Sequence, residues 1–233
     1  MSSPKIKAVL FDLDDTLWPV APVIQYAEAS LYQWMMFNTP EVAQHYSIDR
    51  MRSYREKLVK TNPRFQYDLW SLRHALLSKL FQEFKVDVTK ADEAMAVFAD
   101  ARNKVSLYDD VVPGLQALSK RVELGSISNG FADLHVIGLA PHFKVSLAAH
   151  KFGCAKPDPR IFSAACNALD LPPEQVMYVG DDLLLDVEGA QRAGMQGVWM
   201  NRHQVAQDKP HHAHIKPDAV VASVHDVLAM FLA

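Results

Sequence analysis

The chain has 233 residues, of which 49% are hydrophobic and 22% charged, so it can bury a sizeable core and does not fit a disordered or fibrous class. Its formal net charge of −3 lacks the basic excess that is typical of nucleic-acid binding. Its two cysteines, Cys154 and Cys166, are too few for a disulfide framework. We expect one domain with an insertion, or two small domains.

The first residues, MSSPKIKAVLFDL, do not follow the plan of a secretory signal peptide. No stretch approaches the ~18 consecutive apolar residues of a membrane span. These features predict a cytoplasmic protein with reduced thiols that binds neither membrane nor nucleic acid. They leave its oligomeric state undetermined.

Four short apolar runs end in small or polar residues, as buried parallel strands do. They cover residues 7–13, 121–128, 176–181 and 196–200, and stretches of helical character lie at 157–170 and 186–194. Strand alternating with helix predicts an α/β fold with a doubly wound parallel sheet. Ligands of such a sheet bind outside the carboxyl ends of the strands, where the polar residues of this chain fall.

A long segment of different texture separates the first two predicted strands. Apolar residues recur there at helical spacing, for example at Leu69, Leu72, Leu76 and Leu80. Proline and glycine punctuate both edges, in WPVAP at 18–22 and YDDVVPG at 108–114. We therefore predict an all-helical cap at 19–106, inserted into a core made of residues 1–18 and 107–233.

The stretch FDLDDTL, residues 11–17, places Asp12, Asp14 and Asp15 directly after the first predicted strand. Crowded carboxylates repel one another unless something compensates them. A metal cation is the most economical compensation, and a cation held by carboxylates commonly has phosphate beside it. The alternative is that Asp15 or Thr16 caps a helix while the other acids are solvated.

Three further motifs follow the later strands. SISNG puts Ser128 and Asn129 where a hydroxyl and backbone N–H groups can hold phosphate oxygens. AKPDP offers Lys156 as a fixed cation, with an ordinary surface lysine as the alternative. VGDDLLLD supplies Asp181 and Asp182, with Asp186 following, and its alternative is a helix N-cap.

The four motifs occur in order, each at the C-terminal end of a predicted strand or just beyond. In this the chain resembles the haloacid dehalogenase superfamily, whose phosphatases carry four such motifs, and its insertion resembles the helical cap class of that superfamily. The resemblance spans essentially the whole core. It implies a Mg²⁺-dependent phosphatase that hydrolyses a small phosphorylated molecule through an aspartyl phosphate.

The resemblance also implies a role for each matching residue. Asp12 is the nucleophile, and Asp14 is the general acid and base that protonates the leaving oxygen and later takes a proton from water. Ser128 and Lys156 bind the substrate phosphate, together with the turn at Asn129.

The implied metal ligands are Asp12, the backbone carbonyl of Asp14, and Asp181. Mg²⁺ at this point offsets the repulsion between an ionised carboxylate and an anionic phosphate. Asp186 supports the site from close by, and Asp182 is a candidate for further metal contact.

Other functions stay open at this point. Phosphomutases share the four motifs. Dehalogenases attack carbon and release halide unprotonated, so they need no acid two residues after the nucleophile, and Asp14 argues against them. A phosphate-responsive module, such as a receiver-like domain phosphorylated on Asp12, leaves the insertion and Asp14 unexplained.

Substrate choice is expected to come from the cap, because the core motifs serve only the phosphoryl group. Tyr67, Trp70 and Arg73 recur every three residues and can share one side of a helix, although core packing is an alternative for Trp70. The core motifs are most similar to those of bacterial flavin mononucleotide phosphatases. Flavin mononucleotide is therefore the candidate substrate.

Two other stretches attract notice by composition. The basic run DRMRSYREKLVKTNPR, residues 49–64, is expected to be a solvated helix face. The His-rich stretch HQVAQDKPHHAHIKPD, residues 203–218, is expected to be a surface loop rather than a metal site.

Overall fold

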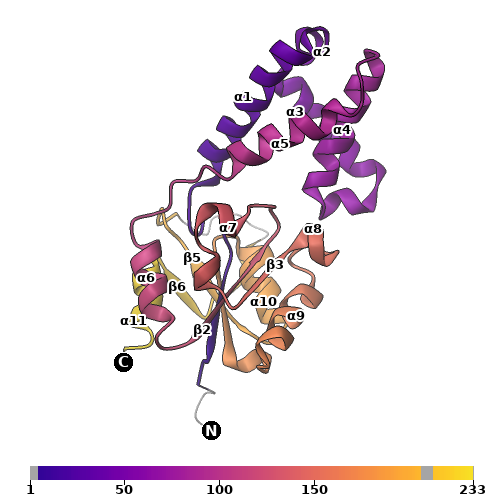
Figure 1. Ribbon diagram of the computed structural model, residues 1–233. Coiled ribbons are helices and arrows are strands. Elements are labelled where there is room, and N and C mark those ends of the chain that lie inside the picture. Colours follow the sequence, from indigo (N-terminus) through magenta and orange to yellow (C-terminus); the bar gives the residue numbers. More distant parts are fainter. Residues whose placement is uncertain (1–4, 206–211, 233) are drawn as a thin grey trace. The chain divides into compact units, whose positions relative to one another are not determined.

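A computed structural model describes residues 5–205 and 212–232 (Figure 1). The chain forms two compact units, one from residues 1–19, 106–129 and 138–233 and the other from 20–105 and 130–137. The predicted boundaries, a core of 1–18 and 107–233 and a cap of 19–106, stay a prediction. The second unit differs from that cap because it also holds residues 130–137, where Phe131 packs against Trp70 and Phe98.

The first unit is built on a six-stranded sheet with the order β3-β2-β1-β4-β5-β6, in which every pairing is parallel. Its strands are β1 Ala8–Phe11, β2 Glu123–Ser128, β3 Val145–Ala148, β4 Val176–Gly180, β5 Gln196–Met200 and β6 Ala219–Val221. All residues of β1 and β4 are buried, as continuous apolar runs require when helices cover both faces. The predicted α/β fold with a doubly wound parallel sheet is confirmed.

Helices cover both faces of this sheet (Figure 1). α6 (Val111–Leu118) and α11 (Val224–Ala229) lie on one face, and α9 (Pro159–Leu169) and α10 (Gly189–Arg192) lie on the other. The remaining short elements are α8 Ala149–Phe152, a π-helical turn Leu183–Glu188, and 3₁₀ turns Ala140–His142 and Pro173–Gln175. α6 approaches α11 so closely that a Cβ at Gly114 would lie 2.5 Å from a methyl carbon of Val224.

The four predicted strands match β1, β2, β4 and β5, but β3 and β6 were not predicted. Both are short, partly buried edge strands: Ser146 interrupts the apolar residues of β3, and the apolar run of β6 is only three residues long. Residues 206–211 of the His-rich stretch lie outside the described residues, so its prediction as a loop is not decided. In the described part of the chain, no helix is both long and apolar enough to span a membrane.

The second unit is helical throughout its described length. It comprises α1 Val20–Asn38, α2 Pro40–His45, α3 Ile48–Leu58, α4 Leu69–Glu83, α5 Lys90–Arg102 and α7 Leu134–Ile137, with 3₁₀ turns at Val59–Thr61 and Pro63–Gln66. Side-chain caps begin two of the helices: Ser47 accepts from the Arg50 N–H, and Asp68 accepts from the Ser71 N–H. The predicted helical spacing places Leu72, Leu76 and Leu80 of α4 in the interior of this unit.

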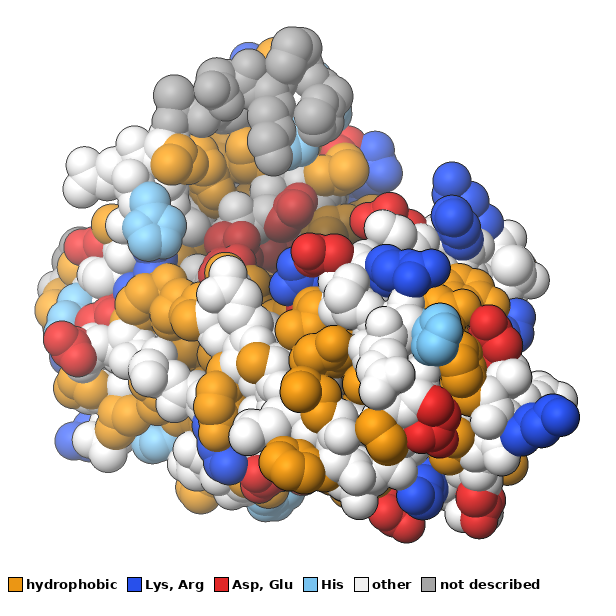
Figure 2. All heavy atoms as spheres, turned by 90° about the horizontal axis from the view of Figure 1, so that it is seen from above, with side chains coloured by type: hydrophobic (Ala, Val, Ile, Leu, Met, Phe, Trp, Pro, Cys, Tyr) orange, Lys and Arg blue, Asp and Glu red, His pale blue; other side chains and the backbone are white. Residues whose placement is uncertain are grey.

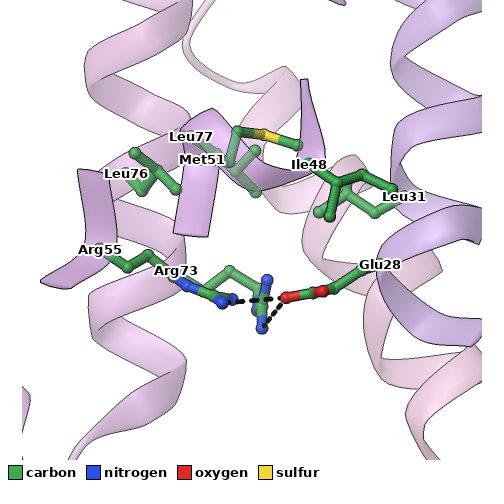
Figure 3. A pocket seen from close by; sticks show the side chains of 8 residues that line it. All are labelled: Glu28, Leu31, Ile48, Met51, Arg55, Arg73, Leu76 and Leu77. Carbon is green, nitrogen blue, oxygen red and sulfur yellow. Dashed lines mark hydrogen bonds and ion pairs between the residues drawn. The ribbon is translucent and has the colours of Figure 1, made fainter. Parts of the chain in front are cut away.

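Glu28 of α1 is a buried acid in this helical unit, with only 3% of its surface exposed. Its carboxylate accepts hydrogen bonds from Arg52 Nε at 2.8 Å and Arg55 Nη2 at 2.9 Å. Arg73 Nη2 lies 3.7 Å away, beside a cavity of about 10 Å³ (Figure 3). Burial opposes ionisation of Glu28, but the arginines outweigh it and lower its pKa.

The basic run is mostly solvated, as expected, because Arg50, Arg52, Lys57, Lys60 and Arg64 are all exposed. What the expectation lacks is that Arg52 and the half-buried Arg55 also reach the buried carboxylate of Glu28. The sequence could not show this, because Glu28 lies in a different helix. Elsewhere on the surface, Figure 2 shows Lys and Arg side chains interspersed with Asp and Glu side chains on one face, in keeping with the small net charge.

We predict that Glu28→Gln lowers the free energy of unfolding by about 3 kcal/mol, because removing one partner leaves buried charge uncompensated. Urea unfolding followed by circular dichroism measures the change. Glu56→Gln on the exposed side of α3 is the matched control and should have little effect. Equal effects of the two variants would show that the Glu28 cluster does not stabilise the unit.

Candidate active site

The sequence motifs meet at the carboxyl edge of the sheet. Asp12 follows β1, Ser128 ends β2, and Asp181 follows β4. Because β2, β1 and β4 are adjacent and parallel, their C-terminal ends lie side by side. The backbone N–H of Asp12 donates to the carbonyl of Val179 in β4 at 2.9 Å. This hydrogen bond joins the first motif directly to the strand that leads into the fourth motif.

Lys156 is buried in this edge, with 4% of its surface exposed, so it is not a surface lysine. Its Nζ donates to Asp12 Oδ1 at 2.5 Å and to Asp186 Oδ1 at 2.6 Å. It also donates to the Tyr178 hydroxyl at 2.9 Å, and that hydroxyl donates onward to the Ile127 carbonyl at 2.8 Å. An ammonium group has three protons. A phosphate oxygen would therefore have to replace one of these acceptors.

Three carboxylates surround this ammonium group. One oxygen from each of Asp12, Asp181 and Asp186 lies within 4.8 Å of the others. Burial raises the pKa of Asp12, and the charges of Asp186 and Asp181 add to this against the opposing effect of Lys156. Burial, Asp186 and Asp15 raise the pKa of Asp181 to about 7. With all three carboxylates ionised, their negative charge exceeds the single positive charge of Lys156, and this repulsion contributes to the raised pKa values.

Carboxylate oxygens are the donors that hard divalent cations such as Mg²⁺ prefer. The donor set therefore fits such a cation, with Asp12 and Asp181 as the residues that would hold it. Asp186 is less suited, because Oδ1 already accepts from Lys156 and Oδ2 accepts from the Asp182 N–H at 3.0 Å.

Asp182 lies outside the carboxylate cluster found among the described residues. Its Oδ1 accepts from the N–H groups of Leu184 and Leu185, both at 2.8 Å, so it caps the π-helical turn. This is the N-cap alternative that the sequence left open. π-Helical turns occur often at functional sites, and this one holds Asp186 so close that a Cβ at Gly180 would lie 2.3 Å from Asp186 Oδ2.

The side chain of Asn129 binds the third motif and does not point toward a ligand. Its Oδ1 accepts from the Lys156 N–H at 2.8 Å, and its Nδ2 donates to the Lys156 carbonyl at 3.1 Å. A phosphate contact from this turn would come from its backbone N–H groups. Ser128 beside it is buried at the end of β2.

The turn after Asp12 also belongs to the site. The Thr16 hydroxyl donates to Asp181 Oδ1 at 3.3 Å, and the Trp18 indole Nε1 donates to Asp14 Oδ1 at 2.8 Å. Neither Thr16 nor Asp15 caps a following helix, because α1 begins only at Val20. These contacts replace the alternative of solvated acids.

Sequence reasoning did not find Tyr178, Trp18 or Trp199, although all three contact predicted site residues. Trp199 Nε1 donates to the Asp181 carbonyl at 2.9 Å. Tyr178 and Trp199 lie within apolar strand runs, where an aromatic residue is ordinary core. The available signal was that each carries a polar atom that needs a partner when buried.

The three cap candidates belong to the second unit and differ in their surroundings. Trp70 meets Phe131 edge-on, with ring centroids 5.5 Å apart. Arg73 lies over the Phe98 ring at 3.7 Å and next to Glu28, so its side chain is taken up by the interior of its own unit. Tyr67 is half-buried ahead of α4.

Comparison with known proteins identifies the family to which the chain is similar. Residues 6–194 match the family described as haloacid dehalogenase-like hydrolase. The chain is 30% identical to the 5-amino-6-(5-phospho-D-ribitylamino)uracil phosphatase of Escherichia coli (strain K12) over 84% of each chain. It is 31% identical to the glyceraldehyde 3-phosphate phosphatase of Methanopyrus kandleri over 96% of each.

Solved structures of similar fold include one protein named as a dehalogenase and one named as a phosphatase. A 2-haloacid dehalogenase from Pseudomonas syringae pv. Tomato DC3000 is 33% identical, with a TM-score of 0.89 over 98% of this chain and 100% of that one. A HAD phosphatase from Thermococcus onnurineus has a TM-score of 0.70 at 24% identity over 97% of each chain, which shows the fold.

Proposed function

This chain belongs to the haloacid dehalogenase-like hydrolase family, and from that membership we propose that it is a Mg²⁺-dependent phosphatase acting on a small-molecule phosphomonoester. The observation that carries the proposal is the meeting of Asp12, Lys156 and Asp181 at one buried edge of the sheet. Asp14 stands two residues after Asp12 as the proton donor that an ester oxygen requires on leaving.

The proposed reaction uses Asp12 and Asp14 in two displacements. A carboxylate oxygen of Asp12 bonds to phosphorus while the bond to the leaving oxygen breaks, and Asp14 gives that oxygen its proton. Water then attacks phosphorus, Asp14 takes the proton from the water, and phosphate departs with the carboxylate of Asp12 restored. When bound, Mg²⁺ offsets the negative charge that Asp12 and the phosphate bring together.

Lys156 and the second motif hold the groups that react. Lys156 fixes Asp12 through the 2.5 Å contact and adds a positive charge beside the phosphate. Asn129 in turn fixes the backbone of Lys156. The Ser128 hydroxyl and the N–H groups of the following turn are the proposed ligands of the phosphate oxygens.

Dehalogenation is the second candidate, and the similarity to the Pseudomonas syringae 2-haloacid dehalogenase favours it. It would use Asp12 as the nucleophile on carbon, but the leaving halide needs no proton, so Asp14 would have no task. The two curated relatives, in contrast, are phosphatases by name. Chloride release from 2-chloropropionate, measured beside phosphate release from p-nitrophenyl phosphate, decides between the two. A phosphomutase would transfer the phosphoryl group to a second substrate rather than release it.

The substrate class that we favour is a ribityl phosphate attached to a planar heterocycle. The Escherichia coli relative is named for such a compound, and flavin mononucleotide, the candidate from the core motifs, is another. The aromatic rings of Tyr67 and Trp70 are the proposed stacking surfaces in the second unit. Glyceraldehyde 3-phosphate, for which the other relative is named, has no ring to stack.

We predict that Asp12→Asn reduces phosphate release from p-nitrophenyl phosphate to background, because the amide lacks the attacking charge but has nearly the same volume. The measurement is phosphate release with Mg²⁺, with thermal unfolding to show that the variant folds. Asp109→Asn, an exposed acid of the same unit, should keep full activity. Residual turnover above a few per cent of the wild type would rule out Asp12 as the nucleophile.

We predict that EDTA stops turnover and that Mg²⁺ restores it, whereas Ca²⁺ restores it poorly because its larger, looser shell misplaces the attack. Mg²⁺ should also raise the melting temperature of the wild type and should fail to do so for Asp181→Asn. Full activity in EDTA or with Ca²⁺ alone would contradict the proposed metal site.

We predict that kcat/KM for flavin mononucleotide exceeds that for glyceraldehyde 3-phosphate, because only the first can stack on an aromatic ring, for about 1 kcal/mol. Tyr67→Ala and Trp70→Ala should reduce kcat/KM for flavin mononucleotide about fivefold and leave the smaller ester unchanged. If either variant lowers kcat/KM for both substrates by the same factor, that residue serves the packing of its unit. If flavin mononucleotide is not preferred, the substrate class is wrong while the phosphatase proposal stands.

A further inference from the structure

Trp18 is a fully buried residue, and its indole N–H has no assigned role in the proposed reaction. Its side chain is 0% exposed, and its indole Nε1 donates to Asp14 Oδ1 at 2.8 Å. A buried indole N–H needs an acceptor. The acceptor here is the carboxylate to which we assign proton transfer.

The backbone of the turn brings the two residues together. The Leu17 N–H donates to the Leu13 carbonyl at 2.7 Å, and the Asp15 N–H donates to the Trp18 carbonyl at 2.7 Å. Asp15 has a φ of 57°, a left-handed conformation that aspartate tolerates better than most residues. The turn therefore loops the chain round so that Trp18 lies beside Asp14, where a parallel backbone bridge joins the two residues. The side-chain hydrogen bond joins them a second time.

The turn is also anchored from outside. Arg202 Nε donates to the Thr16 carbonyl at 2.8 Å, and Arg202 Nη1 donates to Asp110 Oδ1 at 2.8 Å. Asp110 Oδ2 accepts from the Val224 N–H at 2.6 Å. Because the Arg202 side chain is only 7% exposed, this chain of contacts links the turn to the body of the unit. The indole that binds Asp14 is thus itself held in a fixed position.

The hydrogen bond limits how the carboxylate can turn. A carboxylate at the tip of a side chain rotates readily about its last torsion, which is broad for aspartate. An indole N–H can only donate, so it holds Oδ1 in place as an acceptor. In the proposed reaction, Oδ2 is the oxygen through which a proton passes to or from the substrate. Misplacing a reacting group by about 1 Å can cost about a hundredfold in rate.

We propose that Trp18 is a positioning residue for proton transfer: its indole N–H fixes the orientation of the Asp14 carboxylate in which the proton reaches the leaving oxygen. This inference rests on the proposed phosphatase function and assigns a task to a residue beyond the four motifs.

The test compares two esters whose leaving groups differ in their need for a proton. Trp18→Phe removes the N–H and keeps an aromatic ring. Its kcat for an alkyl phosphate such as glycerol 2-phosphate should fall about tenfold more than its kcat for p-nitrophenyl phosphate, because nitrophenolate leaves without protonation. Asp14→Asn should show the same selectivity more strongly. The double variant should be no slower than Asp14→Asn alone, since both changes act on one step.

Two controls separate positioning from packing. Trp34→Phe changes a partly buried tryptophan of the second unit and should leave the ratio of the two kcat values unchanged. β-(3-Benzothienyl)alanine at position 18 replaces the N–H by sulfur at nearly constant volume, so it keeps the packing if Trp18→Phe folds poorly. It should reproduce the selective loss.

Equal losses for both esters in the benzothienylalanine variant, or losses that add to those of Asp14→Asn, would overturn the positioning role. That failure differs from failure of the proposed function. In the latter case the wild-type protein itself releases no phosphate from either ester with Mg²⁺ present.

Discussion

One buried ammonium group holds the candidate site together. Lys156 Nζ joins Asp12 after β1 to Asp186 in the π-helical turn after β4. Burial alone lowers the pKa of a lysine, but Asp12 and Asp186 raise the pKa of Lys156 above its ordinary value, so it stays protonated. A charge in this environment is tolerable only when it is paired and fully hydrogen-bonded, and all three protons of Lys156 have acceptors.

The rest of the site can be understood from this requirement. Asn129 binds both backbone groups of Lys156 and so fixes the starting point of its side chain. Tyr178 supplies the third acceptor, and its own hydroxyl donates a hydrogen bond to a carbonyl of β2. Gly180 leaves the space that Asp186 needs. Each of these residues permits a charged group to remain where water is excluded.

The helical unit also contains a buried ionic cluster, but there the central group is negative and its partners are positive. There the buried carboxylate of Glu28 is held by arginines from α3 and α4. In the first unit carboxylates outnumber the buried cation, which leaves a place for a divalent metal. In the second unit arginines outnumber the buried acid. Both arrangements join segments that are far apart in the chain. In either of them, removing one charged partner would leave the other charge buried and unpaired.

The relatives show why the core alone does not determine the substrate. Two phosphatases named for different substrates are about equally similar to this chain, at 30% and 31% identity. In the proposed reaction, the residues at the carboxyl edge of the sheet act on the phosphoryl group, which every phosphomonoester shares. Discrimination must therefore come from groups that contact the remainder of the substrate, and we look for these in the helical unit.

The sequence by itself determined the α/β class, the four inner strands and the motif residues that meet at the sheet edge. These depend on local patterns, namely apolar runs of strand length and polar residues where the runs stop. It also determined the helical character of the insertion, through spacing within each helix. The partly buried edge strands β3 and β6 were not predicted, because a serine interrupts the apolar residues of β3 and β6 is only three residues long.

Only the tertiary structure decided which partner each polar group takes. Asp182 caps a turn while Asp181 joins the carboxylate cluster, although the two are neighbours in sequence. Arg52 pairs with an acid in another helix, and Asn129 binds the backbone of a residue 27 positions away. Trp18 reaches Asp14 only because the turn between them loops the chain round and brings the two residues side by side. A residue's type sets what it can bind, but burial and packing set which donors and acceptors come within reach.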